Sequence, residues 1–291
     1  MQKTILITGS TDGIGLATAK MLLAQGHHIL LHGRNADKLT KVKAELASSA
    51  EANAAGGSVL GGSASVGGVK GYVADLSDMA GVKTLAAAVA ADLSEQNKPL
   101  DVLINNAGVY SVPNAQTPDG LDVRFVVNTL APYLLTQKLL PVLAKQGRIV
   151  NLSSAAQAPV DTSALQGQGR LSDGAAYAQS KLALTMWSMA MADDLAAEKG
   201  ADSPVIVAVN PASFLGSKMV KDAYGMAGND LSIGADILTR AAVSDEFADA
   251  SGKYFDNDAR RFAQPHSDAL DKTKRDAVVA AVSSTIDRLT R

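Results

Sequence analysis

The feature that most constrains this chain is a glycine-rich turn between a short apolar run and a helix. Residues 4–8 predict a buried strand, and residues 14–25 have the periodicity of an amphipathic helix. The turn between them reads Thr8-Gly9-Ser10-Thr11-Asp12-Gly13-Ile14-Gly15. A diphosphate needs close approach to the main chain and free N–H groups at the start of a helix, and this order of elements offers both. We therefore expect residues 9–15 to hold the phosphates of a dinucleotide. A glycine turn without a ligand is the alternative.

Apolar runs alternate with helical patterns along the rest of the chain. Strands are predicted at residues 4–8, 28–32, 71–74, 100–104, 148–152 and 205–209. Helices are predicted at residues 14–25, 36–47, 79–93, 121–143, 175–198 and within 266–291. The strands are almost entirely Val, Ile and Leu, which is typical of a parallel sheet covered by helices on both faces. The sequence therefore predicts an α/β fold with a single doubly wound domain over residues 1–291.

Three segments depart from this minimal pattern. Residues 48–71 are rich in Ala, Gly and Ser and have too few apolar side chains to offset the entropy of ordering. We predict a flexible surface insertion there, with a lid as the alternative. Residues 157–174 precede the predicted helix at 175–198, and we expect a loop beside the substrate mouth. Residues 212–232 follow the last predicted strand and are expected to form a second substrate-side loop.

Composition narrows the classes of function. The 27 Lys and Arg against 29 Asp and Glu give a formal net charge of −2, which disfavours a protein that binds nucleic acid or an anionic membrane. The chain has no cysteine, which excludes disulfides, thiol nucleophiles and cysteine zinc sites and is compatible with a reducing cytoplasm. No apolar run reaches the roughly 18 residues of a membrane span. We expect a cytoplasmic protein without a metal, a membrane span or a nucleic-acid partner.

The end of the second predicted strand bears on the choice of cofactor. An acidic residue at this position would bond the ribose hydroxyls of NAD, but the sequence has Gly33-Arg34-Asn35. A guanidinium can pair with a 2′-phosphate through bidentate, charge-assisted hydrogen bonds. Arg34 therefore favours NADP over NAD, with a solvated loop arginine as the alternative. The nearby His27, His28 and His32 are interpreted as packing or surface residues.

A second group of polar residues has the chemistry of proton transfer. Tyr177 and Lys181 are four positions apart, on one face of the predicted helix at 175–198. An ammonium beside a phenol favours the phenolate and moves the pKa of the phenol toward the working pH. Ser154 follows the strand at 148–152, at the sheet edge where ligands bind. Asn128 is a polar side chain in an otherwise apolar helix; a satisfied helix-interior amide is the alternative.

Taken together, these residues resemble the short-chain dehydrogenase/reductase family. The matching residues, in family order over residues 1 to about 215, are Thr8-Gly9 with Gly13-Ile14-Gly15, Asp75-Leu76, Asn105-Asn106-Ala107-Gly108, Asn128, Ser154, Tyr177 and Lys181. The Arg34 region, the insertion before Tyr177 and the segment Ser251-Gly252-Lys253-Tyr254-Phe255 resemble the retinol-dehydrogenase-like branch and related reductases. The resemblance implies a Rossmann-type fold with a seven-stranded parallel sheet and hydride transfer between nicotinamide C4 and a carbonyl or secondary alcohol carbon.

The resemblance also implies roles for the reactive residues. Tyr177 would be the general acid/base, and Ser154 would hold the substrate oxygen. Lys181 would bind the nicotinamide ribose hydroxyls and lower the pKa of Tyr177. Asn128 would hold a water that links Lys181 to solvent. We choose Ser154 over Ser153 because family members with paired serines usually use the second, and alternation along a strand points the two side chains in opposite directions.

The remaining assignments concern the cofactor and the alternatives. Asp75 and Leu76 would flank the adenine, and Asn105 would brace the sheet. The other residues expected to bind the cofactor are Asn106, Ala107, Gly108, Pro211 and Phe214. The family usually has Pro-Gly after the sixth strand, where this chain has Pro211-Ala212. A nucleotide-binding sensor with idle chemistry and a sugar epimerase or dehydratase are the alternative functions. Family analogy implies a homodimer or homotetramer through the long helices.

Overall fold

The computed structural model describes residues 1–56, 67–225 and 227–291, and its centre is one eight-stranded sheet. In space the strands follow the order β3-β2-β1-β4-β5-β6-β7-β8. Every neighbouring pair is parallel except β7 and β8, which form an antiparallel edge. The strands are β1 (Thr4–Ile7), β2 (His28–Gly33), β3 (Val69–Val73), β4 (Leu100–Asn105), β5 (Leu143–Leu152), β6 (Val205–Asn210), β7 (Tyr254–Asp256) and β8 (Arg261–Ala263).

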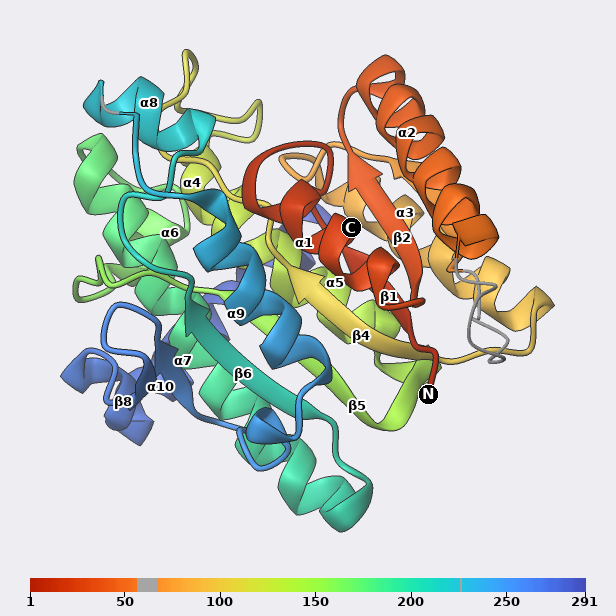
Figure 1. Cartoon of the computed structure of the whole chain (residues 1–291). Coiled ribbons are helices and arrows are strands. Elements are labelled where there is room, and N and C mark those ends of the chain that lie inside the picture. The colour runs from red at the N-terminus through yellow and green to blue at the C-terminus, as the bar shows by residue number, and fades with distance from the viewer. Residues whose placement is uncertain (57–66, 226) are drawn as a thin grey trace.

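Helices cover both faces of the sheet, as Figure 1 shows. One face carries α1 (Gly13–Ala24), α2 (Ala36–Gly56) and α9 (Leu231–Val243); the other carries α3 (Met79–Glu95), α5 (Ala131–Leu139) and α7 (Asp173–Lys199), with α10 (Lys272–Leu289) packed against α7. The short helices α4 (Val123–Phe125), α6 (Thr162–Leu165) and α8 (Lys218–Tyr224) lie in connecting segments. None of the helices in the described part of the chain is long and apolar enough to cross a membrane.

Alternation along the strands divides the apolar core into two layers. In β1, Ile5 and Ile7 pack with Leu22 of α1, whereas Leu6 between them packs with the cluster under α3, α5 and α7. Both layers are completely buried at these positions, because successive side chains of a strand point to opposite faces. This confirms the predicted doubly wound α/β fold, in which a parallel sheet is covered on both sides.

The strand order reverses beside β1, and this reversal positions the site. The chain runs from β1 outward to β2 and β3, and then returns to β4 on the other side of β1. Ligands of doubly wound sheets bind at the carboxyl ends of the strands at such a reversal. The glycine turn that follows β1 lies at this point.

Several predicted boundaries were wrong. The sheet has an eighth strand, antiparallel, beyond the predicted seven. The helix predicted at 36–47 continues to Gly56, because this stretch is rich in alanine, which has the highest helix propensity. Residues 48–56 are therefore not a loop. Of the rest of the predicted insertion, residues 57–66 lie outside the described residues. The strand β5 starts at Leu143 rather than at residue 148.

The helix predicted at 121–143 is interrupted by a π-helical turn over Val126–Leu130. In this turn the N–H of Ala131 bonds the carbonyl of Val126, five residues earlier. Pro132 follows and has no N–H to donate to the carbonyl of Asn128. The regular ladder therefore breaks around Asn128, and π turns of this kind are frequent at functional sites.

Candidate active site

The glycine turn after β1 has the main-chain geometry of a phosphate site. Gly9 and Gly13 have φ values of +65° and +53°, which favour glycine. Asp12 caps α1 by accepting a hydrogen bond from the N–H of Gly13 at 2.8 Å. A Cβ on Gly15 would collide with Gly9 O and Asn106 Nδ2, so this helix packs closely against the turn. The turn and the N-terminus of α1 fit a diphosphate.

The end of β4 is tied to this turn. The amide of Asn106 donates to the carbonyls of Thr8 and Gly9 at 2.8 and 3.2 Å. Thr8 Oγ1 in return accepts from the main-chain N–H groups of Asn106 and Ala107, each at 3.0 Å. Asn105 donates to Asn151 Oδ1 of β5 at 2.8 Å and so braces the sheet, as predicted.

His32 and Ser10 have structural roles in the turn that the sequence interpretation missed. His32 Nδ1 accepts from the N–H of Gly9 at 3.1 Å, and Nε2 bonds the carbonyl of Ala74 at 3.1 Å. Burial lowers the pKa of His32 to about 4, so the ring is neutral and these two bonds are compatible. Ser10 is completely buried, and its hydroxyl accepts from the N–H of His32 at 2.9 Å. The Ser10 side chain therefore ties the turn to β2, and the assignment of Ser10 to the cofactor site, which concerns its main chain, stays a prediction.

The residues assigned to the adenosine end lie at the ends of β2 and β3. Arg34 is exposed, directly after Gly33, where a Cβ would lie 2.6 Å from the Thr11 side chain of the glycine turn. Asp75 is exposed as well, and its Oδ1 accepts from the N–H and the hydroxyl of Ser77. The Leu76 side chain is buried in the core, and its assigned place beside the adenine stays a prediction.

Lys181 is the best-defined member of the reactive group. Its Nζ donates to the carbonyl of Leu152 at 2.7 Å and lies 5.7 Å from the centre of the Tyr177 ring. Burial lowers the pKa of Lys181 to about 8, because desolvation disfavours the ammonium. The group is thus still mostly cationic at neutral pH. Both residues lie near the N-terminus of α7, which Ser172 caps through its bond to the N–H of Ala175.

The two serines after β5 differ in exposure, which is what alternation of their side chains predicts. Ser153 is buried, and its Oγ lies 2.7 Å from Thr185 Oγ1 of α7. The Ser154 side chain is partly exposed, and its Oγ accepts from the N–H of Ala156 at 3.1 Å. The accessible hydroxyl is therefore that of Ser154, and its assigned role stays a prediction.

Asn128 and Lys181 meet at Gly108. The Asn128 side chain accepts from Val109 N at 2.8 Å and donates to Val109 O and Ser180 Oγ at 3.0 Å. A Cβ on Gly108 would lie 3.3 Å from Asn128 Oδ1 and 3.5 Å from Lys181 Nζ. The two side chains therefore approach the same point, and Gly108 leaves this point free. The water relay assigned to Asn128 stays a prediction.

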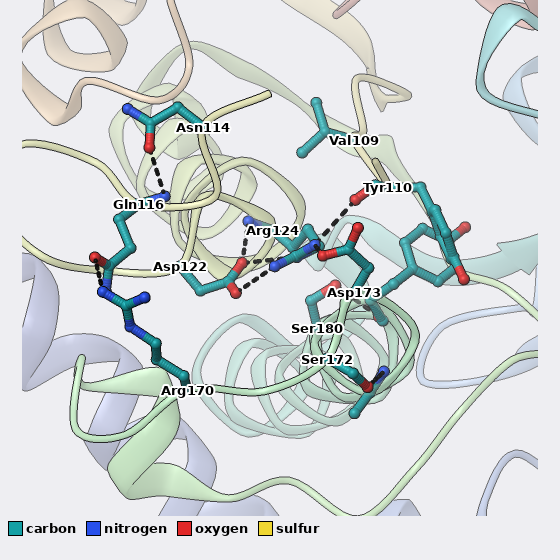
Figure 2. Close-up of polar contacts among 12 residues, drawn as sticks. Val109, Tyr110, Asn114, Gln116, Asp122, Arg124, Arg170, Ser172, Asp173 and Ser180 are labelled. Atoms are coloured by element: carbon teal, nitrogen blue, oxygen red, sulfur yellow. Dashed lines mark hydrogen bonds and ion pairs between the residues drawn. The ribbon is translucent and has the colours of Figure 1, made fainter. Parts of the chain in front are cut away.

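Figure 2 shows a buried arginine that the sequence interpretation missed. Arg124 of α4 is 1 % exposed and bonds Asp122 through Nε at 2.8 Å and Nη2 at 2.6 Å. Its Nη1 donates to the carbonyl of Tyr110 at 3.2 Å and also pairs with Asp173 in the first turn of α7. The Tyr110 ring lies 4.9 Å from the Tyr177 ring, centre to centre. Arg124 thus joins the loop after β4 to the helix that carries Tyr177.

The loop after β4 and the segment predicted at 157–174 come together beside Arg124 and border a cavity of about 180 Å³. No described residue of the other predicted substrate-side loop, 212–232, lines this cavity. The loop after β4 contributes Ala115 and Gln116, and the segment predicted at 157–174 contributes Arg170 and Leu171. Arg170 Nη2 donates to Gln116 Oε1 at 3.2 Å, so the two loops are also bonded to each other, as Figure 2 shows.

Replacing Arg124 with Met should destabilise the fold by about 1.5–3 kcal/mol, because the hydrogen bonds from the buried guanidinium to Asp122 and Asp173 are lost. Urea denaturation followed by circular dichroism measures the loss. The matched control is Arg240→Met: Arg240 pairs with Glu246 at 2.7 Å, but on the surface of α9. Such exposed pairs are worth at most about 1 kcal/mol. Equal losses for the two variants would contradict the assigned importance of Arg124.

The loop after β6 is strained where the resembled family has glycine. Ala212 has a φ of +108° and Phe214 a φ of +53°. Asp258 holds the segment by accepting from the N–H and the hydroxyl of Ser213 at 2.9 and 2.6 Å. The Phe214 side chain is 48 % exposed. The loop thus presents an apolar ring to solvent at the carboxyl edge of the sheet.

Ala212→Gly should therefore stabilise the protein by about 0.5–1 kcal/mol, since glycine adopts a positive φ without the strain of a Cβ and this outweighs its larger entropy when unfolded. Urea denaturation is the measurement. Ala80→Gly, in the first turn of α3, is the control and should cost about 0.5–1 kcal/mol because its backbone is helical. Destabilisation of both variants by the same amount would refute strain at Ala212.

Comparisons with known proteins agree with this geometry. A family model described as short chain dehydrogenase matches residues 3–226. Human retinol dehydrogenase 13 is 29 % identical over 292 residues, which cover 94 % of this chain and 82 % of that protein. Human polyprenol dehydrogenase is 34 % identical over 208 residues, which cover 67 % of this chain but 56 % of the length of that protein.

Solved structures are similar over most of the chain. A structure of an uncharacterized protein from Mycobacterium paratuberculosis has a TM-score of 0.73 at 26 % identity and covers 98 % of this chain and 94 % of its own. A short chain dehydrogenase from Burkholderia cenocepacia, in complex with NADP, has a TM-score of 0.64 at 26 % identity and covers 87 % of this chain and 95 % of its own.

Proposed function

The chain belongs to the short chain dehydrogenase family, and from this premise we propose that it transfers a hydride between NADP(H) and a ketone, an aldehyde or a secondary alcohol. The observation that carries the proposal is the approach of Lys181 and Asn128 to Gly108, with the Tyr177 ring centre 5.7 Å from Lys181 Nζ. Gly108 lies two residues after Asn106, whose amide donates to the carbonyl of Thr8 at the start of the glycine turn. This arrangement supports a proton-transfer group and a diphosphate site at one edge of the sheet.

The chain's own residues fit the cofactor. Residues of the glycine turn would bind the diphosphate through their main-chain N–H groups. Arg34, exposed at the end of β2, would pair with the 2′-phosphate, which favours NADP. Lys181 would bond the nicotinamide ribose. When bound, the nicotinamide supplies or accepts the hydride.

The chemistry at the substrate oxygen is assigned to three side chains. In the direction of reduction, the Tyr177 hydroxyl gives its proton to the oxygen as the hydride reaches the carbon. The Lys181 ammonium stabilises the phenolate that remains. The Ser154 hydroxyl, the accessible one of the pair after β5, donates a hydrogen bond to the same oxygen and stabilises its developing charge.

The proposed substrates are apolar carbonyl compounds or alcohols. Two relatives are named for retinol and polyprenol, and the Tyr110 ring against Tyr177 offers apolar surface beside the reactive group. A sensor with idle chemistry is not favoured, because Asn128, Ser154, Tyr177 and Lys181 are all present. An epimerase or dehydratase is not favoured, because the matching family model and the relatives reported above are named as dehydrogenases.

The experiment is a cofactor-oxidation screen. NADPH and NADH are each incubated with the protein and a panel of carbonyl compounds that begins with the aldehydes of retinol and polyprenol, and absorbance of the reduced cofactor is followed. We expect oxidation of NADPH in preference to NADH. Tight binding of NADPH without oxidation by any compound of the panel would refute the proposed function.

A further inference from the structure

The segment Ser251–Phe255 resembles a family branch, but the proposed chemistry gives it no task. Its tyrosine, Tyr254, lies on β7 and reaches across to the end of β5. We propose that Tyr254 is a positioning residue for Ser154: together with Gln157, it holds the main-chain carbonyl of Ser154 and so aims the Ser154 hydroxyl at the substrate oxygen. This inference rests on the proposed function.

Two side-chain donors share the carbonyl of Ser154. Tyr254 Oη donates to it at 3.1 Å, and Gln157 Nε2 donates at 2.9 Å. A carbonyl oxygen has two lone pairs, so both are used. The Ser154 hydroxyl oxygen accepts from the N–H of Ala156 at 3.1 Å, which leaves the hydroxyl proton available for donation. The main chain of Ser154 is thus fixed on one side while its O–H bond stays free for a substrate.

Both donors are themselves held in place. Tyr254 is 5 % exposed and is paired in register with Ala208 of β6. Burial raises the pKa of Tyr254, and Asp256 and Asp258 raise it further, so the hydroxyl keeps the proton that it donates. Gln157 Oε1 accepts from the N–H of His266 at 2.9 Å, which directs the amide nitrogen toward Ser154.

The main chain of the two residues before Ser154 is held as well. Lys181 Nζ donates to Leu152 O at 2.7 Å, and the N–H of Ser153 donates to Val209 O of β6 at 2.8 Å. The strand end that carries Ser154 is therefore fixed from α7, from β6 and, through Tyr254 and His266, from the C-terminal part of the chain. Reactive groups have to be held within fractions of an ångström of their productive geometry, and such supporting contacts provide this.

A buried tyrosine could also donate to the nearest carbonyl for stability alone, and a double-mutant cycle separates the two roles. The variants are Tyr254→Phe, Ser154→Ala and the double variant. If Tyr254 acts through Ser154, Tyr254→Phe should lower kcat about 10-fold in the wild-type background and leave kcat unchanged in the Ser154→Ala background, since groups that act as a unit are not additive. The Kd for NADPH should not change.

The matched control is Tyr133→Phe. Tyr133 on α5 is 6 % exposed, and its Oη lies 3.2 Å from Ser283 Oγ of α10, so its hydroxyl bonds another element than the strand end that carries Ser154. This variant also loses one hydroxyl from a buried ring but should keep the wild-type kcat. Where Tyr254→Phe does not fold, Gln157→Leu removes the second donor, and the same cycle is measured with that variant.

The outcomes separate this inference from the function on which it rests. An unchanged kcat for Tyr254→Phe, or an equal loss in both backgrounds, would overturn the positioning role while turnover by the wild type still supports the proposed function. Full activity of Ser154→Ala would show that Ser154 takes no part in the reaction, and Tyr254 could then have no positioning role through it. A wild type that oxidises NADPH with no carbonyl compound would overturn the function and, with it, the inference.

Discussion

Tyr177→Phe is expected to lower kcat by about 1,000-fold, because the substrate oxygen would lose the group that gives it a proton. The substitution removes a single oxygen atom and keeps the ring that packs against Tyr110 at 4.9 Å between centres. Binding of the cofactor should therefore be almost unchanged. A loss confined to kcat assigns Tyr177 to the chemical step rather than to binding.

The measurement combines steady-state kinetics with the best carbonyl compound of the screen and fluorescence titration with NADPH. Tyr72→Phe is the control, since the Tyr72 hydroxyl bonds Asp92 Oδ2 at 2.6 Å on the outer strand β3, away from the reactive group. This control should keep the wild-type kcat. A kcat for Tyr177→Phe close to that of Tyr72→Phe would contradict the assigned role.

Arg34→Leu should weaken NADP binding by roughly 30- to 150-fold and leave NAD binding almost unchanged. The expected loss of about 2–3 kcal/mol is that of a hydrogen bond between charged groups, and only NADP carries the 2′-phosphate that forms it. Arg34 is exposed at the end of β2, so its replacement should not affect folding.

Isothermal titration with each cofactor measures the two affinities. Lys43→Leu, on the exposed side of α2, removes the same charge at a distance from the turn and should change neither affinity much. If Arg34→Leu weakens NAD and NADP by the same factor, Arg34 does not recognise the 2′-phosphate.

The sequence was sufficient to predict structural features that depend on residues close together in the chain. The order of strand, glycine turn and helix was predicted correctly, because the positive φ of Gly9 and Gly13 and the cap by Asp12 involve neighbouring residues. That this turn binds phosphates stays a prediction. Continued alternation past β5 predicted that Ser153 and Ser154 differ in exposure, but only the family resemblance chose Ser154. The helical spacing of Tyr177 and Lys181 likewise puts the ammonium 5.7 Å from the ring centre.

The sequence was insufficient where a contact joins distant parts of the chain. His32 looked like a packing residue, and only the pairing of β1 with β2 brings its ring to Gly9. The same pairing turns Ser10 inward. Arg124 and Tyr254 bond partners 49 and 100 positions away. For Arg124, the sequence offered one indication of burial: this charged residue directly precedes the apolar run that starts at Phe125.

The most direct test of hydride transfer uses NADPH that carries deuterium at nicotinamide C4, on the transferred side. The protein is incubated with this cofactor and a carbonyl compound from the screen, and the alcohol is analysed by mass spectrometry. The proposed function predicts one deuterium on the alcohol carbon for each cofactor oxidised with the wild type, and almost no alcohol with Tyr177→Phe. Alcohol without deuterium, or oxidation of the cofactor without any alcohol, would contradict it.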